Sequence, residues 1–141
     1  MSSKKNHAAD QEESRIYNKL RNREILLIDD DELIRDSLTL FFMGEGIHLS
    51  AIASAEKGLE ALAKHNYDII IVDYRLPGVD GVEFFKRIKE TQKDTLKILI
   101  TAYKDHKVVS EADKIGIQDF IEKPFTSKTI KHALSLLVAE H

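Results

Sequence analysis

The amino-acid sequence predicts an α/β protein in which five parallel strands form a single sheet with helices on both faces. Short apolar runs alternate five times with segments of helical spacing between Glu24 and the C-terminus, and five such β/α units in a row indicate a parallel sheet. The chain has 141 residues, 43% of them hydrophobic, so it is long enough for one domain with a substantial core. Right-handed crossovers would place the C-terminal ends of all the strands at one edge of the sheet.

Five segments are expected to be strands, because each is a short apolar run with polar or turn-forming residues at its end. In chain order they are EILLID (24–29), IHLSAIAS (47–54), YDIIIVD (67–73), LKILITA (96–102) and DFIEK (119–123).

Five further segments carry apolar residues at helical spacing and are expected to be helices. In chain order they are DELIRDSLTLFFM (31–43), AEKGLEALAKHN (55–66), GVEFFKRIKET (81–91), DHKVVSEADKI (105–115) and SKTIKHALSLLVAEH (127–141). In the second of them, Leu59, Leu62 and Ala63 are expected to face the core. Gly116 follows the fourth and suits a helix C-terminal cap.

The first 23 residues are polar and charged and are expected to form an extension outside the domain of residues 24–141. Ile16, Tyr17 and Leu20 could form a short apolar stripe on a helix. Two interpretations stand side by side: a disordered tail, and a helix that docks or dimerises.

Composition excludes several classes of function. With 21 Lys and Arg against 24 Asp and Glu, the formal net charge is -3, which gives no sign of a nucleic-acid-binding surface. The absence of cysteine excludes disulfides, thiolate catalysis and cysteine-based zinc sites. No apolar stretch reaches membrane-spanning length, and the N-terminus lacks the apolar core of a secretory signal. A cytoplasmic protein that binds neither nucleic acid nor membrane is therefore expected.

Polar side chains follow four of the expected strands. The first strand ends in Asp29 and Asp30, the third in Asp73, the fourth in Thr101 and the fifth in Lys123. Taken singly, each has a structural explanation, such as a helix N-cap, a β-branched strand residue or a solvated surface charge. The topology, however, brings all of them to one edge of one sheet, where α/β proteins bind ligands.

This combination of side chains is suited to phosphoryl transfer. Carboxylates within about 4–6 Å of each other raise each other's pKa unless a cation joins them. Mg²⁺ suits such a cluster, because it prefers oxygen ligands and keeps waters that a phosphate can replace. One carboxylate could then attack phosphorus as a nucleophile, while the hydroxyl and the ammonium hold the transferred oxygens.

Four segments resemble the signature segments of response-regulator receiver domains. They are ILLIDDDELIR, IIIVDYRLPGVDG, ILITA and DFIEKPF. They occur in the family's order, and the resemblance covers Glu24 to about Glu140. It implies the flavodoxin-like (βα)5 receiver fold, a doubly wound sheet with strand order 2-1-3-4-5 and five helices.

The resemblance also implies roles for individual residues around a bound Mg²⁺. Asp73 would accept the phosphoryl group. Asp30 would ligate Mg²⁺ directly, Asp29 would act mostly through water, and the backbone carbonyl of Arg75 would complete the protein's ligands.

The remaining implied roles concern the signal. Thr101 and Lys123 would contact the phosphoryl oxygens, and Phe120 would turn inward when Thr101 moves toward the phosphate. Because Phe120 has no hydroxyl, only packing would stabilise its inward state. The altered surface would comprise the fourth helix, the fifth strand and the fifth helix. The family's Lys-Pro bond is cis, so the Lys123–Pro124 bond is expected to be cis.

By the same resemblance, the phosphoryl donor would be a sensor histidine kinase or a histidine phosphotransfer protein in a two-component system or phosphorelay. The six histidines of the chain show no metal-ligand spacing, and none is placed to act as a donor. The output would be an unidentified protein or effector domain, and a homodimer is compatible with the pattern. Arg75 and Tyr103 are bulky at positions that in receivers influence how water reaches the acyl phosphate, which predicts a long-lived phosphoryl group.

Three alternatives compete with a phosphoacceptor regulator. A haloacid-dehalogenase-type phosphatase would use an Asp-x-Asp pair, which Asp29 and Asp31 could imitate, but this leaves Asp73 unexplained. A receiver fold that no longer takes phosphate would act only as a binding module. The chain could also be the receiver piece of a longer regulator. Segments around Tyr103 and Phe125 are similar to receivers of nitrogen-regulation-type activators and of the sporulation phosphorelay intermediate.

Overall fold

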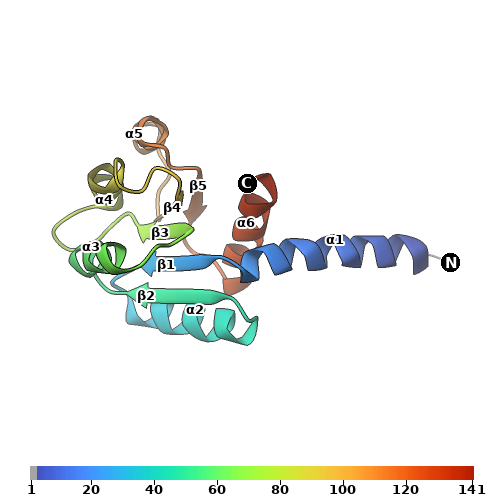
Figure 1. Cartoon of the computed structure of the whole chain (residues 1–141). Helices are drawn as coiled ribbons and strands as arrows, with labels where there is room; N and C mark the ends of the chain where they lie inside the picture. The colour runs from blue at the N-terminus through green and yellow to red at the C-terminus, as the bar shows by residue number, and fades with distance from the viewer. Residues whose placement is uncertain (1–2) are drawn as a thin grey trace.

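A single parallel sheet of five strands forms the centre of the molecule (Figure 1). The computed structural model describes residues 3–141. The strand order is β2-β1-β3-β4-β5, and each neighbouring pair is parallel. The strands are β1 (Glu24–Ile28), β2 (His48–Ile52), β3 (Ile69–Asp73), β4 (Leu96–Thr101) and β5 (Asp119–Glu122). The predicted fold class and strand order are confirmed.

Helices cover both faces of the sheet (Figure 1). They are α1 (Ser3–Arg21), α2 (Glu32–Gly44), α3 (Ala55–Lys64), α4 (Gly81–Ile88), α5 (His106–Ile115) and α6 (Ser127–Glu140). The buried side chains of α2 and α6 pack into one core cluster with the sheet, and those of α3, α4 and α5 pack into the other. The described chain therefore has the five expected helices and one more, α1.

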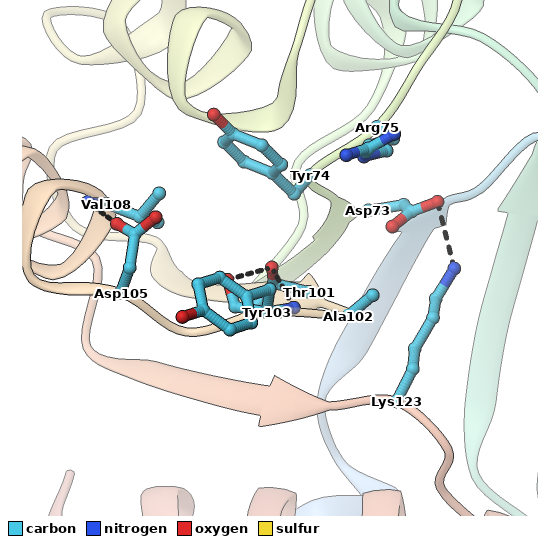
Figure 2. Close-up of a pocket in the computed structure, with 9 residues that line it drawn as sticks. All are labelled: Asp73, Tyr74, Arg75, Thr101, Ala102, Tyr103, Asp105, Val108 and Lys123. Atoms are coloured by element: carbon cyan, nitrogen blue, oxygen red, sulfur yellow. Dashed lines mark hydrogen bonds and ion pairs between the residues drawn. The ribbon is translucent and has the colours of Figure 1, made fainter.

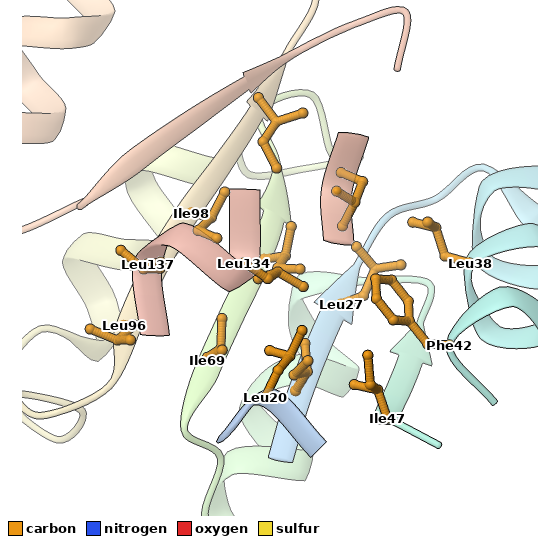
Figure 3. Close-up of a cluster of buried hydrophobic side chains, with 14 of the residues drawn as sticks. Leu20, Leu27, Leu38, Phe42, Ile47, Ile69, Leu96, Ile98, Leu134 and Leu137 are labelled. Atoms are coloured by element: carbon orange, nitrogen blue, oxygen red, sulfur yellow. The ribbon is translucent and has the colours of Figure 1, made fainter. Parts of the chain in front are cut away.

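Successive residues of the central strands point into the two clusters in turn. In β1, Ile25 and Leu27 belong to the α2–α6 cluster, which Figure 3 shows, whereas Leu26 and Ile28 belong to the other. All four are fully buried. A strand buried on both faces needs apolar residues at every position, which explains the continuous apolar runs of the sequence.

The end of α1 is attached to the domain, and the rest of the helix projects away from it (Figure 1). Leu20 is fully buried in the α2–α6 cluster. Arg21 Nε donates a hydrogen bond of 3.0 Å to the Glu45 carbonyl, and Lys131 Nζ lies 3.9 Å from the centroid of the Tyr17 ring. Met1 and Ser2 lie outside the described residues.

The prediction for the inner face of α3 is wrong in part. Leu59 is 36% exposed and Ala63 is exposed, whereas the helix buries Ala55 and Gly58. A Cβ atom on Gly58 would lie 2.5 Å from Ile28 Cδ1, so the helix approaches the sheet through the side that has no side chain. The apolar spacing could not reveal this, because the close approach depends on a glycine.

Local signals end the elements as the sequence indicates. Gly116 caps α5 with φ 82°, a left-handed conformation that glycine adopts without steric cost, and the Lys123–Pro124 bond is cis. Within the described residues, no helix has the length and apolar character needed to cross a membrane.

Candidate functional site

Three carboxylates meet at the C-terminal edge of the two central strands. Asp29 and Asp30 follow β1, and Asp73 is the last residue of β3. One oxygen from each of these three side chains lies within 4.8 Å of the others. The chain order reverses between β1 and β3, the usual place for a ligand site in an open parallel sheet. The structure therefore brings together the acidic residues that the sequence predicts to be neighbours.

Asp29 is the most constrained of the three. Its side chain is completely buried; Oδ1 accepts a hydrogen bond of 2.9 Å from the Asp31 N–H, and Oδ2 has no hydrogen-bond partner. The pKa of Asp29 is raised from 3.8 to about 6, mainly by burial and also by the nearby Asp73 and Asp30 carboxylates, against the opposing effects of the Asp31 N–H and Lys123. A buried carboxylate oxygen without a partner is costly.

These features fit a hard divalent cation. Oxygen donors from carboxylates are the ligands that Mg²⁺ prefers, and a cation would satisfy the unpartnered Oδ2 of Asp29. Asp30 is exposed, so a bound ion would keep access to water and to a phosphate. The donor set therefore suits Mg²⁺ held by Asp29, Asp30 and Asp73.

Asp73 is held by a cation from the neighbouring strand end. Lys123 Nζ lies 3.2 Å from Asp73 Oδ2, as the dashed line in Figure 2 shows. Burial raises the pKa of Asp73, while the Lys123 ammonium and the Arg75 backbone lower it. Asp73 is 4% exposed, so this ion pair with Lys123 is largely shielded from water on the Asp73 side.

Thr101 ends β4 beside Asp73, but its hydroxyl is occupied within its own loop (Figure 2). Thr101 Oγ1 donates to the Tyr103 carbonyl at 3.0 Å and accepts from the Tyr103 N–H at 3.2 Å. The side chain is buried. To contact a group on Asp73, the hydroxyl must therefore give up its donor bond to Tyr103.

A cavity of about 260 Å³ opens beside Asp73. Its walls come from the loops after β3 and β4 and from the start of α5. They are formed by Asp73, Tyr74, Arg75, Thr101, Ala102, Tyr103, Asp105, Val108 and Lys123 (Figure 2). The sequence analysis missed Tyr74, Ala102, Asp105 and Val108. The first two directly follow predicted site residues, which was the available signal, whereas Asp105 reads only as the N-cap of α5, a role it also has.

Two predicted residues stand at the periphery of the site. Arg75 is exposed and lines the cavity. Phe120 is half-buried in β5 and lies outside the cavity lining, with Lys104 Nζ 5.3 Å from the centroid of its ring.

Asp31 does not join the carboxylate cluster. Its Oδ1 accepts hydrogen bonds from the N–H groups of Leu33, at 2.9 Å, and Ile34, at 3.4 Å, so it is the N-cap of α2. The Asp-x-Asp pair that a haloacid-dehalogenase-type phosphatase needs is therefore not formed by Asp29 and Asp31. The carboxylate that lies beside Asp29 and Asp30 is that of Asp73.

Comparison with known proteins identifies the family to which this fold belongs. Residues 25–135 match the family model described as "Response regulator receiver domain". Sporulation initiation phosphotransferase F of Bacillus subtilis is 30% identical over 115 residues, which cover 82% of this chain and 93% of that protein. The transcriptional regulatory protein FixJ of Bradyrhizobium diazoefficiens is 37% identical over 101 residues, but these cover 72% of this chain and only 49% of FixJ.

Solved structures show the same fold. A CheY-like receiver domain protein from Methanospirillum hungatei superposes with a TM-score of 0.79 at 24% identity, covering 84% of this chain and 94% of that one. The signal receiver domain of an HD domain-containing protein from Pseudomonas fluorescens gives 0.74 at 30% identity, covering 84% and 95%. The chain belongs to the response regulator receiver domain family of two-component signalling.

Proposed function

We propose that the chain is a phosphorylation-activated signalling receiver in which Asp73 accepts a phosphoryl group with Mg²⁺. The proposal rests on one observation above the others. Oδ2 of the buried Asp73 lies 3.2 Å from Lys123 Nζ, and Asp73 belongs to a cluster of three carboxylates. In this proposal the protein is a regulator that catalyses only its own phosphoryl transfer and dephosphorylation.

In the proposed reaction an oxygen of Asp73 attacks the phosphorus of a phosphohistidine. The new O–P bond forms as the P–N bond breaks, and the leaving imidazole nitrogen keeps the electron pair and takes up a proton. Bound Mg²⁺, held by Asp29, Asp30, Asp73 and the Arg75 carbonyl, would neutralise charge on the phosphoryl oxygens. Lys123 would move its ammonium from Asp73 to one phosphoryl oxygen, a charge-assisted hydrogen bond.

The phosphoryl group would also recruit the Thr101 hydroxyl, whose present acceptor is the Tyr103 carbonyl. Movement of Thr101 opens space toward Phe120 on β5, and packing alone would hold that ring inward. The surface that changes would be formed by α5, β5 and α6. An output protein or effector domain would bind this surface in one state and not in the other.

An apolar surface next to the site is suited to the phosphoryl donor, a histidine kinase or a histidine phosphotransfer protein. Ile34, Lys123, Pro124 and Phe125 line a shallow hollow of about 370 Å³. Beside it, α2 exposes three large apolar side chains: Leu33 (74%), Leu40 (68%) and Met43 (65%). Apolar side chains gathered on one helix face are typical of a surface that another helix covers.

The proposed unit is the receiver domain of residues 24–141, with residues 1–23 as an extension that contributes α1. We place it in the cytoplasm, without direct contact to nucleic acid or membrane, and allow a homodimer. The chain spans about half the length of FixJ. That it controls an effector, in the same or another protein, is therefore proposed.

The test is the intact mass of the protein after incubation with acetyl phosphate, with Mg²⁺ or with EDTA. We expect a gain of one phosphate in the wild type and in the surface control Asp36→Asn, only when Mg²⁺ is present, and none in Asp73→Asn. A gain in Asp73→Asn would mean that another residue is the acceptor. No gain in any protein, together with no response to beryllofluoride, would support the binding-module alternative.

A further inference from the structure

The loop after β4 connects two parts of the proposed switch. At its start, the Thr101 hydroxyl is bonded in both directions to the backbone of Tyr103. The residue after Tyr103 is Lys104, whose Nζ lies 5.3 Å from the centroid of the Phe120 ring. One short segment thus holds the threonine hydroxyl and also covers the aromatic ring on β5.

The contact between Lys104 and Phe120 favours the conformation in which it is seen. A lysine ammonium within about 6 Å of a ring centroid is attracted by the negative face of the ring. Phe120 is half-buried and packs against the α3–α4–α5 core cluster, whereas Lys104 is exposed. The ring is therefore held by the core on one side and by the Lys104 cation on another, and turning it away loses the second attraction.

A phosphoryl group that binds the Thr101 hydroxyl would disturb the bond between Thr101 and Tyr103 and, through the backbone, the contact between Lys104 and Phe120. Thr101 has one hydroxyl proton, which it cannot donate both to the Tyr103 carbonyl and to a phosphoryl oxygen. The Tyr103 N–H can still donate to Thr101 Oγ1, but once the hydroxyl proton is donated elsewhere, the bond to the Tyr103 carbonyl is lost. The position of Lys104, the neighbouring residue, is then no longer fixed by this bond.

We propose that Lys104 is a latch: its cation–π contact with Phe120 stabilises the resting conformation and so opposes activation. The inference rests on the proposed function and adds to it a positioning residue that acts through Phe120 rather than by touching the phosphoryl group. The latch sets how much of the phosphoryl-binding energy is used to release the ring.

The direction in which one substitution changes the affinity for an anion separates this role from a simple electrostatic one. Removing a cation close to an anion-binding site weakens anion binding by loss of attraction. Removing a latch strengthens anion binding, because less of the binding free energy is used for the conformational change. The two explanations therefore predict opposite changes for Lys104→Gln.

The experiment is a calorimetric titration of the full chain with beryllofluoride, a phosphoryl mimic, in saturating Mg²⁺. We expect Lys104→Gln to bind about two- to fivefold more tightly than the wild type, the range of an exposed cation–π contact. Lys104→Arg should behave as the wild type, since it keeps the cation. Lys107→Gln, an exposed lysine of α5, controls for the loss of one charge and should leave the Kd unchanged or weaken binding.

A double-mutant cycle completes the test. Phe120→Leu keeps an apolar side chain but removes the ring, so Lys104→Gln should have no tightening effect in that background. Unchanged or weaker binding by Lys104→Gln in the wild-type background would overturn the latch and leave the receiver function standing. Failure of the wild type to bind beryllofluoride, or equal binding by Asp73→Asn, would overturn both.

Discussion

Asp29 carries a cost that a cation would remove. Its carboxylate is fully buried, and Oδ2 has no partner. We expect Asp29→Asn to raise the free energy of unfolding of the metal-free protein by about 1–3 kcal/mol, because a neutral amide loses less on burial than an unpaired charge. Urea unfolding in EDTA at pH 7.5 measures this, and the exposed Asp30→Asn variant should change less. A destabilised Asp29→Asn would contradict the account.

The same group predicts a pH dependence. Burial raises the pKa of Asp29 from 3.8 to about 6 in the folded protein, so the folded state holds a proton that the unfolded state has already released between these values. Its contribution to stability is fully present below about pH 4 and is lost as pH rises through about 6. Metal-free wild type should therefore lose stability from pH 5 to pH 7.5 relative to Asp29→Asn. Equal pH profiles in urea would contradict this.

Gly81 is a second residue whose identity the site requires. A Cβ atom there would lie 2.7 Å from the Asp73 carbonyl oxygen, and the Gly81 N–H donates to the Tyr74 carbonyl at 2.8 Å. Gly81→Ala should destabilise the protein by about 1–3 kcal/mol through overpacking and slow labelling by acetyl phosphate. Gly44→Ala is the matched control, because nothing lies within 4 Å of its Cβ position, and it should be neutral or slightly stabilising.

The side chains of Arg75 and Tyr103 bear on the lifetime of the phosphoryl group. Both line the cavity beside Asp73, and Tyr103 is 75% exposed. We expect the phosphorylated wild type to persist for minutes or longer and Tyr103→Ala to hydrolyse faster, because a smaller residue admits water to the phosphorus. The rate of loss in Mg²⁺ buffer measures this; loss within seconds from the wild type would refute it.

At the scale of elements, α1 depends on one buried side chain. Leu20 is fully buried in the α2–α6 cluster, whereas Ile16 is only half-buried. Leu20→Ala should cost about 2–4 kcal/mol of unfolding free energy, and Ile16→Ala distinctly less. Labelling by acetyl phosphate should be the same in both variants under folding conditions. An unchanged stability of Leu20→Ala would show that α1 does not depend on this contact.

The sequence predicted the sheet well because each central strand is buried on both faces and therefore reads as an unbroken apolar run. It also predicted α3, but not the side of that helix that faces the sheet, since Gly58 rather than Leu59 lies there. Lys97 is a further departure: it stands within an apolar run yet is 4% exposed, with Nζ donating to the Gln92 and Thr95 carbonyls at 2.7 and 2.9 Å. Both carbonyls belong to the loop just before β4, and the sequence gives no sign that this loop turns them toward the Lys97 ammonium.

The candidate site, too, has residues whose positions the sequence predicts and residues whose positions it does not. Asp29, Asp73 and Lys123 could be placed together because topology brings strand ends to one edge. The direction of the Thr101 hydroxyl and the position of Lys104 over Phe120 could not be predicted, because both depend on the conformation of one loop.

At the scale of the whole molecule, the apolar face of α2 predicts how the donor binds. Leu40→Glu should slow phosphoryl transfer from a histidine kinase that phosphorylates the wild type by about tenfold or more, the effect of losing a central interface contact. Labelling by acetyl phosphate should not change. Leu59→Glu, the same substitution on the opposite face of the sheet, is the control; equal slowing in both variants would contradict a docking surface on α2.

The claim that Asp73 is the phosphoacceptor is tested most directly by locating the bond itself. The chain would be labelled with acetyl phosphate and Mg²⁺ and reduced with borohydride, which converts an aspartyl phosphate to homoserine. Peptide mass spectrometry then finds the converted residue. The account predicts homoserine at position 73 alone, and none without acetyl phosphate. Conversion at Asp29 or Asp30, or no conversion in a protein that has gained phosphate, would contradict it.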